Sequence, residues 1–362
     1  RAAKRLGELC SAEGTTIHRL LETRFDPQTG QLTFAHNERD PLKADAVIVD
    51  ETSMVDISLM AALLSALRED CRLVLVGDPD QLPSVGAGNL LSDLIRSGRV
   101  PTVRLTEVFR QAARSAIIRA AHLVNEGKLP NLKNDSRQDF FFLRRPDPAD
   151  AEETIVELVR KRLPENMGIP AGQIQVLSPT RKYDGGTASL NRMLQAAVNP
   201  PDPEKGERAF GPYIFRQGDR VMQVKNNYDI MWKTSDGLEM GMGIFNGDIG
   251  HVLEVDNRRE LITVDFDGHI VEYAPDMLGE LEPAYAVTVH KAQGSEYRAV
   301  ILAALDTAPR LLTRGVLYTA ITRARELLVI VGDEGVVARM AANNRQARRY
   351  SGLRARLARE EG

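Results

Sequence analysis

The sequence predicts an α/β protein with two parallel-sheet units and a small β-barrel inserted into the second unit. Short buried-type strands alternate with helical patterns at both ends of the chain, as in parallel sheets covered by helices. From residue 206 to 282 the sequence pattern changes to closely spaced strand and turn signals, which favours a barrel. The 362 residues also exceed the roughly 150 that one domain typically uses.

The first predicted unit covers residues 1–112. Apolar residues recur at helical spacing from Leu59 to Leu67. Ser53, with Asp56 three residues later, is the expected cap of this helix. The strand candidates of the unit are 47–49, 72–76 and 103–105.

A protruding β-hairpin is predicted inside the first unit, at about residues 22–44. The turn-forming run Asp-Pro-Gln-Thr-Gly at 26–30 lies between short β-prone pieces. We expect the hairpin to occupy the stretch between Phe25 and Asn37.

The second predicted unit covers residues 113–205 and 283–340. It is expected to hold another parallel sheet, because strands and helices alternate in it as in the first unit. A basic tail, residues 341–362, follows; from residue 339 onward the chain has seven arginines and two glutamates. The strand candidates of the unit are 174–178, 298–305 and 327–331, and its helix candidates are 115–125, 187–198 and 315–325.

The inserted barrel is predicted at residues 206–282. The proline-rich segment 199–208 is the expected linker into it. Asp267-Gly268 is a strong signal for a two-residue hairpin, and residues 256–259 are a weaker one. The strand candidates of the barrel are 215–224, 250–255, 261–266 and 269–273.

Composition excludes several classes of protein. Lysine plus arginine (47) and aspartate plus glutamate (50) leave a net charge of −3, so a nucleic-acid partner has to be argued from local residues. The apolar run Ala299 to Leu305 is far shorter than the roughly 18 residues of a membrane helix. Two cysteines are too few for a disulfide framework. We expect a soluble cytoplasmic protein without membrane contact.

Two predicted strands end in acidic residues, Asp50-Glu51 and Asp78, and Gln81 follows three residues after the second. Ligands of open parallel sheets bind beyond the carboxyl ends of the strands. An Asp there suits Mg²⁺, and an adjacent Glu suits the water that attacks a γ-phosphate. The alternative is that Asp50 and Glu51 simply begin a helix, where carboxylates suit the helix dipole. The run Gly-Asp-Pro-Asp-Gln-Leu-Pro at 77–83 favours the nucleotide interpretation.

Five segments resemble motifs II to VI of the superfamily 1 helicases, in the family's order. The residues of these motifs are most similar to those of RecD-type enzymes, the 5′→3′ branch that includes the alpha subunit of exodeoxyribonuclease V. Residues 1–6 also resemble the end of motif Ia, and 14–21 the DNA-contacting motif after it. The five segments are Val-Asp-Glu-Thr-Ser-Met (49–54), Val-Gly-Asp-Pro-Asp-Gln-Leu-Pro-Ser-Val (76–85), Leu-Thr-Glu-Val-Phe-Arg-Gln (105–111), Tyr-Ala-Val-Thr-Val-His-Lys-Ala-Gln-Gly-Ser-Glu (285–296) and Leu-Tyr-Thr-Ala-Ile-Thr-Arg-Ala-Arg (317–325).

The resemblance implies two RecA-like domains of the P-loop NTPase type, an SH3-like barrel in the second, and a hairpin that separates strands. It implies an ATP-dependent 5′→3′ helicase that moves on single-stranded DNA and acts at single-strand/duplex junctions, with ATP and Mg²⁺ as cofactors. Two alternatives remain open. One is a degenerate ATPase that serves as a nucleic-acid-binding subunit, and the other is a superfamily 1 helicase of other polarity or with an RNA substrate.

Carried over by position, the resemblance assigns the nucleotide-site residues. Asp50 would hold Mg²⁺, Glu51 would be the catalytic base and Gln81 would sense the γ-phosphate. Arg110 and Arg323 would reach that phosphate across the cleft between the two units, while Arg325 also suits a solvated helix face. Asp78, Gly294 and Glu296 would contact the nucleotide.

The resemblance also assigns contacts to the backbone of a single strand, where hydroxyl and basic side chains bind without reading sequence. In the barrel, Asn226, Asn227 and Tyr228 are further candidates, whereas Trp232 is expected to pack. The basic tail suits either a solvated helix or DNA contact. The backbone-contact candidates are Thr15, Thr16, His18, Thr180, Arg181, Thr288 and His290.

The printed sequence has no Gly-x-x-x-x-Gly-Lys-Ser/Thr loop, which this family uses to cradle phosphates. Its one Gly-Lys pair, Gly127-Lys128, is followed by Leu129. We expect the loop to precede Arg1 in a longer protein.

The 362-residue chain alone is therefore expected to bind ATP poorly and to hydrolyse essentially none. The measurement is phosphate release with and without single-stranded DNA. ATPase activity that single-stranded DNA stimulates in this chain alone would contradict the prediction.

Overall fold

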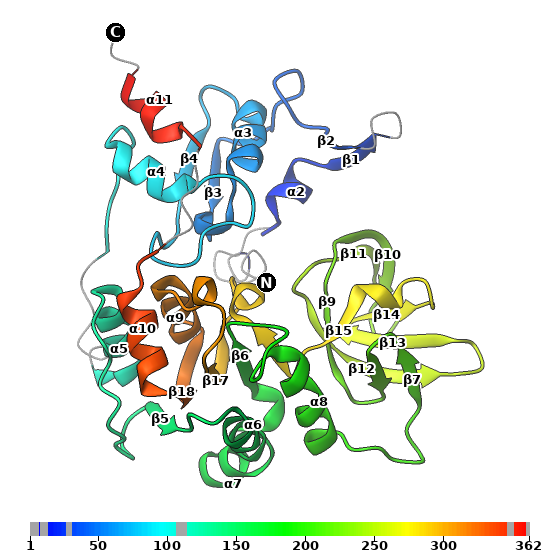
Figure 1. Ribbon diagram of the computed structural model, residues 1–362. Helices are drawn as coiled ribbons and strands as arrows, with labels where there is room; N and C mark the ends of the chain where they lie inside the picture. Colours follow the sequence, from blue (N-terminus) through cyan, green and yellow to red (C-terminus); the bar gives the residue numbers. More distant parts are fainter. Residues whose placement is uncertain (1–6, 8–13, 27–30, 106–113, 346–350, 360–362) are drawn as a thin grey trace. The chain divides into compact units, whose positions relative to one another are not determined.

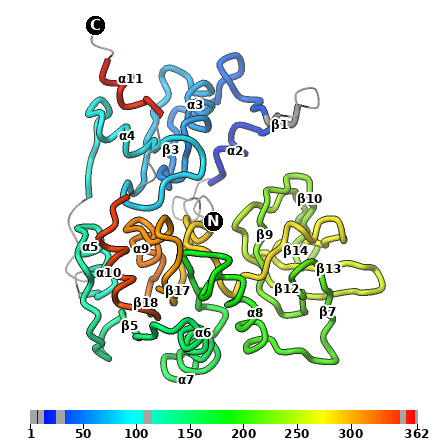
Figure 2. The backbone as a smooth tube through the Cα atoms, in the orientation of Figure 1, coloured from blue at the N-terminus to red at the C-terminus, as the bar shows by residue number. Residues whose placement is uncertain are grey.

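The computed structural model describes residues 7, 14–26, 31–105, 114–345 and 351–359. Within these ranges, no helix has both the length and the apolar character needed to cross a membrane. The chain divides into two compact units, one formed by residues 1–110, 293–295 and 345–362, and the other by 111–292 and 296–344 (Figures 1 and 2).

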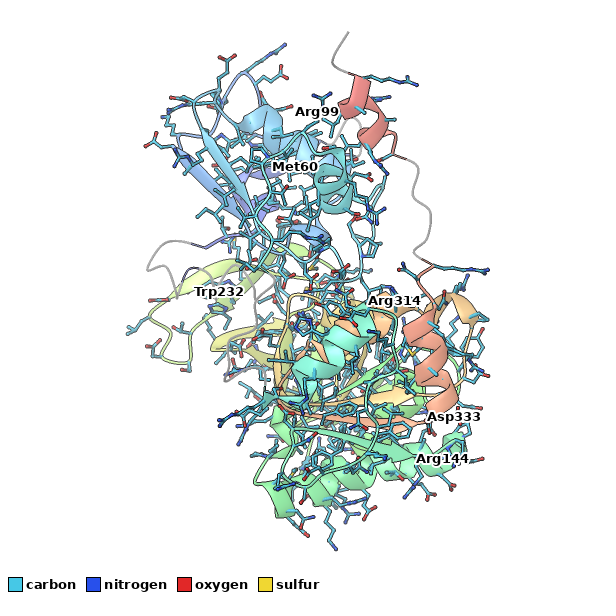
Figure 3. The ribbon with its side chains drawn as sticks, turned by 90° about the vertical axis from the view of Figure 1, so that its left-hand side faces the viewer. Met60, Arg99, Arg144, Trp232, Arg314 and Asp333 are labelled. Carbon is cyan, nitrogen blue, oxygen red and sulfur yellow. The ribbon has the colours of Figure 1, made fainter. Side chains whose placement is uncertain are left out.

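The first unit is built on two parallel strands, β3 (Ala46–Val49) and β4 (Arg72–Leu75). Side chains alternate along β3, so Val47 and Val49 are buried while Ile48 is exposed. Helix α3 (Ile57–Ala66) supplies Met60, labelled in Figure 3, to the same core. Leu63 of this helix also belongs to that core. Helix α4 (Leu90–Ser97) adds Leu90. Two of the three predicted strands, and the predicted helix, are present.

The start of α3 differs from its prediction. Asp56, rather than Ser53, is the N-cap, and its Oδ1 accepts from the backbone N–H of Leu59 at 2.8 Å. Ser53 lies one turn earlier, in the short 3₁₀ helix η1 (Thr52–Met54). A carboxylate adjoining the first helical residue reaches the free N–H groups, which the serine hydroxyl does not.

The predicted hairpin is confirmed. Strands β1 (Thr23–Asp26) and β2 (Gln31–Phe34) pair antiparallel, after the single turn of α2 (Ile17–Leu20). Leu21 is fully buried at its base and joins the core of the first unit. The tip, 27–30, lies outside the described residues.

The strand expected at 103–105 is absent. Residues 101–105 have no regular secondary structure, and Val103 and Leu105 are 90% and 96% exposed. A strand exists only when a neighbour takes up its backbone hydrogen bonds, and no described strand pairs with this segment. Apolar, β-branched composition alone therefore misled the prediction.

The end of the chain packs within the first unit. Helix α11 (Leu353–Arg359) lies beside α4, as Figure 1 shows, and Leu353 contacts the core of that unit. The Ser351 hydroxyl donates to Asp93 Oδ2 at 3.0 Å. The arginine-rich segment thus has a docked apolar side as well as exposed arginines.

The described part of the second unit has a five-stranded sheet, in the order β16-β6-β17-β18-β5, and every pairing is parallel. The predicted helix 115–125 begins at its Ser115 cap, and that at 187–198 is confirmed, whereas the one expected at 315–325 ends at Ile321. The strands are β5 (Phe140–Arg144), β6 (Ile174–Ser178), β16 (Ala286–Thr288), β17 (Tyr297–Ala304) and β18 (Ala324–Gly332). The helices are α5 (Ala116–Asn125), α6 (Pro148–Glu157), the π-helical turn η3 (Leu158–Arg162), α7 (Leu163–Met167), α8 (Thr187–Val198), the 3₁₀ turn η6 (Val289–Ala292), α9 (Arg314–Ile321) and α10 (Glu334–Ala342).

The barrel interrupts this unit between α8 and β16. Its main sheet runs in the order β11-β10-β14-β13-β12-β9-β15, around a core that includes Phe215, Ile262 and Tyr273. The predicted Asp267-Gly268 turn is confirmed, since both residues have positive φ, 53° and 92°. The strands are β7 (Glu207–Phe210), β8 (Tyr213–Arg216), β9 (Arg220–Gln223), β10 (Asn227–Lys233), β11 (Met240–Ile244), β12 (Ile249–Asp256), β13 (Leu261–Phe266), β14 (His269–Tyr273) and β15 (Leu281–Pro283).

A buried carboxylate, Asp219, joins the barrel to the parallel-sheet part of the unit. It accepts from Asn199 Nδ2 at 2.7 Å, from the Tyr285 hydroxyl at 2.9 Å and from the backbone N–H of Arg216 at 2.7 Å. Gln195 Nε2 donates to the same group. Burial raises the pKa of Asp219, and these donors oppose the rise. Its partners come from α8, the barrel and the start of β16, so one side chain sets how the barrel attaches.

Replacing Asp219 with Asn should destabilise the second unit by about 2–3 kcal/mol, because an amide nitrogen would face a buried N–H donor and leave it unpaired. The measurement is urea unfolding of Asp219→Asn, with the exposed Asp229→Asn as the matched control. Equal unfolding midpoints for the two variants would show that Asp219 does not hold the barrel.

Candidate functional site

Two carboxylates follow the strands of the first unit at one edge. Val49 and Leu75 are register partners in the parallel pair, so Asp50 and Asp78 both lie at the carboxyl ends of β3 and β4. Asp50 is exposed, and its Oδ1 accepts from the backbone N–H of Glu51 at 2.8 Å. This is the edge at which open parallel sheets bind ligands.

Glu51 has a left-handed backbone, with φ 51° and ψ 39°. That conformation costs a non-glycine residue about 1–3 kcal/mol. Thr52 holds the turn in place, because its N–H donates to the carbonyl of Val76 at 2.9 Å and its hydroxyl donates to the carbonyl of Val49 at 3.0 Å. Backbone strain held by surrounding contacts is typical of functional sites.

Two buried polar atoms beside these carboxylates lack hydrogen-bond partners among the described residues, Gln81 Oε1 and Ser53 Oγ. Gln81 Nε2 does donate, to Asp78 Oδ2 at 3.4 Å. An unpaired buried polar group costs about 1–3 kcal/mol. The arrangement therefore suits a ligand that supplies the missing hydrogen bonds.

The acidic edge fits a magnesium ion shared with a nucleotide. No group of three or more histidine, cysteine or acidic side chains among the described residues could hold a metal without help. Mg²⁺ is usually bound by one or two protein carboxylates together with phosphate oxygens and water. Asp50 and Asp78 supply that number of carboxylates at the strand ends.

The short segment 293–295 belongs to the first unit. Gln293 Nε2 donates to the carbonyl of Leu82 at 2.7 Å, next to Gln81. Gly294 has φ +69°, while a Cβ there would meet only ordinary contacts, so the backbone angle is what requires glycine. Glu296, two residues later, is exposed.

The two arginine candidates differ in what the structure describes. Arg323 follows α9 and is buried, and its Nε donates to the carbonyl of Thr319 at 3.3 Å while Nη2 donates to Thr322 Oγ1 at 3.3 Å. These contacts orient its guanidinium. Arg325 is exposed. Arg110 lies outside the described residues.

A small cavity of about 50 Å³ in the second unit brings together Arg181 and Thr288, two of the residues expected to bind a nucleic-acid backbone. Arg181 Nη2 lies 2.8 Å from Glu282 Oε1 and 2.8 Å from the Tyr213 hydroxyl. Lys291 Nζ lies 3.0 Å from Glu282 Oε2. The sequence reasoning missed Tyr213, Glu282 and Lys291; only Lys291 carried a signal, because it follows His290 in the same motif.

The other second-unit candidates of the single-strand set lie close by in the chain. Thr180 is buried, and its carbonyl accepts from the backbone N–H of Thr187 at 3.1 Å. His290 is exposed on η6. Both follow strands of the parallel sheet, β6 and β16, at their carboxyl ends.

The single-strand candidates of the first unit cluster around α2. Thr16 is the N-cap of this turn, and its Oγ1 accepts from the N–H of Arg19 at 3.3 Å. Thr15, just before it, is half-buried. The His18 ring lies 5.9 Å from that of Phe34 on the hairpin. Burial lowers the pKa of His18, and Asp56 partly opposes the shift.

The candidate residues of the barrel differ in whether their side chains already have a structural role. Asn227 Nδ2 donates to Glu280 at 3.0 Å, and its Oδ1 accepts from the N–H of Ile230 at 3.0 Å, so this amide supports the barrel itself. Asn226 is exposed and donates to the Tyr228 hydroxyl at 3.3 Å. Trp232 stacks on His269 with ring centroids 4.0 Å apart, a packing role (Figure 3).

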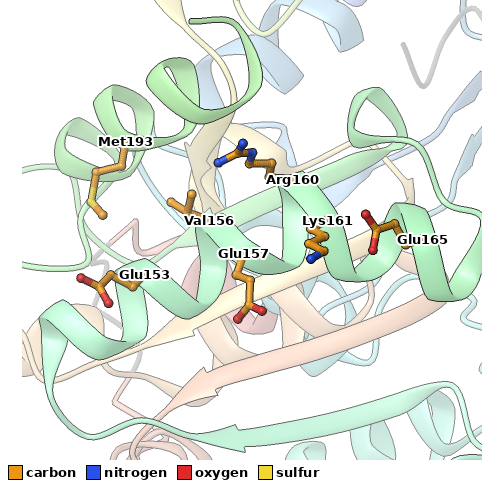
Figure 4. A pocket seen from close by; sticks show the side chains of 7 residues that line it. All are labelled: Glu153, Val156, Glu157, Arg160, Lys161, Glu165 and Met193. Atoms are coloured by element: carbon orange, nitrogen blue, oxygen red, sulfur yellow. The ribbon is translucent and has the colours of Figure 1, made fainter.

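A wider hollow lies apart from all these residues. It has a volume of about 610 Å³ and lies on the helical layer of the second unit (Figure 4). Both acidic and basic side chains surround this hollow, and none of them lies in the five helicase-like segments. We therefore assign it no functional role. Its lining is Glu153, Val156, Glu157, Arg160, Lys161, Glu165 and Met193.

Three family models match successive parts of the chain. A family described as an AAA domain matches residues 1–141. The ATP-dependent RecD-like DNA helicase SH3 domain matches 190–266, and the UvrD-like helicase C-terminal domain matches 283–331. The last two matches fall on the barrel region and on the parallel-sheet strands that follow it.

Curated relatives match nearly the whole chain. The ATP-dependent RecD2 DNA helicase of Deinococcus radiodurans is 39% identical over 96% of this chain and 44% of that protein. The RecBCD enzyme subunit RecD of Mycolicibacterium smegmatis is 32% identical over 96% of this chain and 60% of that protein. The chain thus spans about half the length of the curated relatives it matches.

A solved structure shares the fold. The Pif1 helicase from Bacteroides, in complex with ADP-AlF3 and ssDNA, matches with a TM-score of 0.50 at 19% identity, over 90% of this chain and 80% of that one. Together with the SH3 match, the parallel sheets make the chain a pair of RecA-like domains with an SH3-like barrel inserted in the second.

His18 should make stability depend on pH. Because its pKa in the folded chain is below the usual 6.5, the unfolded chain binds the proton more readily, and stability should fall as pH drops below about 6.5. Above that pH the His18 side chain is neutral in both the folded and the unfolded chain, so it should not lower the free energy of unfolding. Urea unfolding from pH 5 to 8, with His18→Gln beside the unchanged chain, measures this. A pH slope that survives the substitution unchanged would contradict it.

Proposed function

We propose that this chain, which belongs to the RecD type of superfamily 1 helicases, is the motor segment of an ATP-dependent 5′→3′ DNA helicase. It would translocate on single-stranded DNA and unwind duplex at single-strand/duplex junctions. The observation that carries the proposal is the acidic strand edge. There Asp50 and the strained Glu51 adjoin buried oxygens of Gln81 and Ser53 that have no partner in the described part of the chain.

Asp50 and Asp78 would hold Mg²⁺ together with the phosphates of ATP. Bound Mg²⁺ would neutralise charge that develops on the transferred phosphoryl group. Glu51, next to Asp50, would orient the attacking water and take its proton. Gln81 would sense the γ-phosphate end through the attacking water, because its buried Oε1 can accept a hydrogen bond from that water and has no donor among the described residues.

The remaining nucleotide contacts are proposed from motif position. Arg323 and Arg110 would place guanidinium groups on the γ-phosphate, where fixed positive charge favours the transition state over the ground state. Gly294 and Glu296 would line the sugar–phosphate side. Support for Arg323 comes from its burial and its two hydrogen bonds, which limit the positions its guanidinium can take.

The DNA would be held through its backbone. Hydroxyl and basic side chains bind phosphate without reading sequence, as a translocating enzyme requires. Support comes from the placement of Thr180, Arg181, Thr288 and His290 just beyond or at the ends of β6 and β16. In the first unit the contacts would be Thr15, Thr16 and His18, beside the hairpin proposed to split the duplex. In the barrel, Asn226 is favoured over Asn227.

Glu51→Gln in the full-length protein should lower single-strand-stimulated ATPase by about 10²–10⁴-fold, since the proton acceptor is lost. Arg323→Ala should lower it by about a thousandfold. Single-strand binding should stay within about threefold of the unchanged protein, since ground-state strand binding does not require hydrolysis. The matched control is Arg325→Ala, an exposed arginine of the same motif. Retained unwinding in either site variant would refute its role.

Polarity and substrate are tested on partial duplexes with a 5′ or a 3′ single-stranded tail, in DNA and in RNA. The proposal expects displacement from the 5′-tailed DNA only. Unwinding of the 3′-tailed or RNA substrates would indicate a superfamily 1 helicase of another kind. Single-strand binding without ATPase activity in the full-length protein would indicate a degenerate, binding subunit.

A further inference from the structure

Two basic side chains of the second unit share one carboxylate. Glu282 Oε1 lies 2.8 Å from Arg181 Nη2, and Glu282 Oε2 lies 3.0 Å from Lys291 Nζ. The three residues come from separate elements: Glu282 from the barrel strand β15, Arg181 from the segment after β6, and Lys291 from η6 after β16. A barrel strand therefore places its acidic side chain at the edge of the parallel sheet where the single strand is proposed to bind.

The surroundings of this carboxylate are those of an anion site. The Tyr213 hydroxyl lies 2.8 Å from Arg181 Nη2, and Thr288 lines the same cavity. Apolar side chains, Met222 and Pro283 among them, form other parts of the wall. Two cations and two hydroxyl groups thus converge on a small space.

The groups around Glu282 are partly open to solvent. The exposed fractions of the side chains are 51% for Arg181, 33% for Lys291 and 20% for Glu282. Ion pairs with this exposure are weak in water, because both partners are hydrated when they separate. Replacing the Glu282 carboxylate with another anion therefore costs little free energy.

Glu282 is not needed to attach the barrel. That role falls to the buried Asp219, which accepts from Asn199, Tyr285 and the backbone of Arg216. Gln175 and Arg220 add contacts between the barrel and the sheet, since Gln175 Nε2 donates to the carbonyl of Ala284 at 3.3 Å and Arg220 Nη1 to that of Ile174 at 3.1 Å. A half-exposed pair adds little to such a buried network.

We propose that Arg181, Lys291 and Tyr213 form a seat for one backbone phosphate of a single strand, and that Glu282 occupies this seat until the strand displaces it. A phosphate presents oxygens to the two cations as the carboxylate does. Glu282 is thus a built-in competitor that weakens single-strand binding. The inference rests on the proposed single-strand binding and deepens it.

The test measures binding of a fluorescent oligothymidylate to the full chain by anisotropy, without nucleotide, over a range of NaCl concentrations. Glu282→Gln should bind about 3–10-fold more tightly at 0.1 M NaCl, since the competitor loses its charge. The slope of log affinity against log salt should change by less than the roughly 0.7 of one phosphate contact, because the same phosphates are bound in both proteins.

The matched control is Glu254→Gln on the exposed face of barrel strand β12, which changes the net charge equally. It should change affinity less than twofold. Equal tightening by both variants would show a general charge effect and overturn the proposal. Adding Arg181→Ala and Lys291→Ala to Glu282→Gln should abolish the gain, and a gain that persists would place the phosphate elsewhere.

The thermal midpoint of each variant separates a structural role from competition. A large fall in the midpoint of Glu282→Gln, with weaker binding, would make Glu282 a structural tie and overturn the proposal. An unchanged chain that binds no single strand refutes both this seat and the proposed DNA track. Binding and tightening without ATPase activity in the full-length protein would refute the motor but support the seat.

Discussion

Parallel strand pairing is the constraint on which the rest of this structure depends. It brings the carboxyl ends of neighbouring strands to one edge, so Asp50 and Asp78 both lie beyond the ends of β3 and β4. In the second unit the same rule places Arg181 and Thr288 at the ends of β6 and β16, which pair directly. The hydrogen-bonded sheet, rather than any local motif, therefore gathers the candidate chemistry of each unit at one edge.

Two carboxylates connect the barrel to that sheet, and burial gives them different roles. Asp219 is 1% exposed and has a full set of donors, so its removal costs stability. Glu282 is partly exposed and faces two cations that a phosphate would also attract. A buried carboxylate is suited to permanent attachment, whereas a hydrated one is suited to exchange.

Much of the fold could be predicted from the sequence, because hydrophobic periodicity reports local structure directly. The strand at 174–178, the helix at 187–198 and the Asp267-Gly268 turn are local features, and they form as predicted. The strand expected at 103–105 does not form, because strand formation depends on a partner. At the start of the helix at 57–66, Asp56 is the cap where Ser53 was expected, a choice that the geometry of one turn decides.

The sequence by itself determined the class of fold, the order of the elements and the residues of the motifs, since each depends on spacing along the chain. Only the tertiary structure decided which side chains meet. Arg181 and Glu282 are about a hundred positions apart, and Asp219 and Tyr285 are 66 apart. Contacts over such separations arise when strand pairing and core packing fold the chain back on itself, and no periodicity in the sequence encodes them.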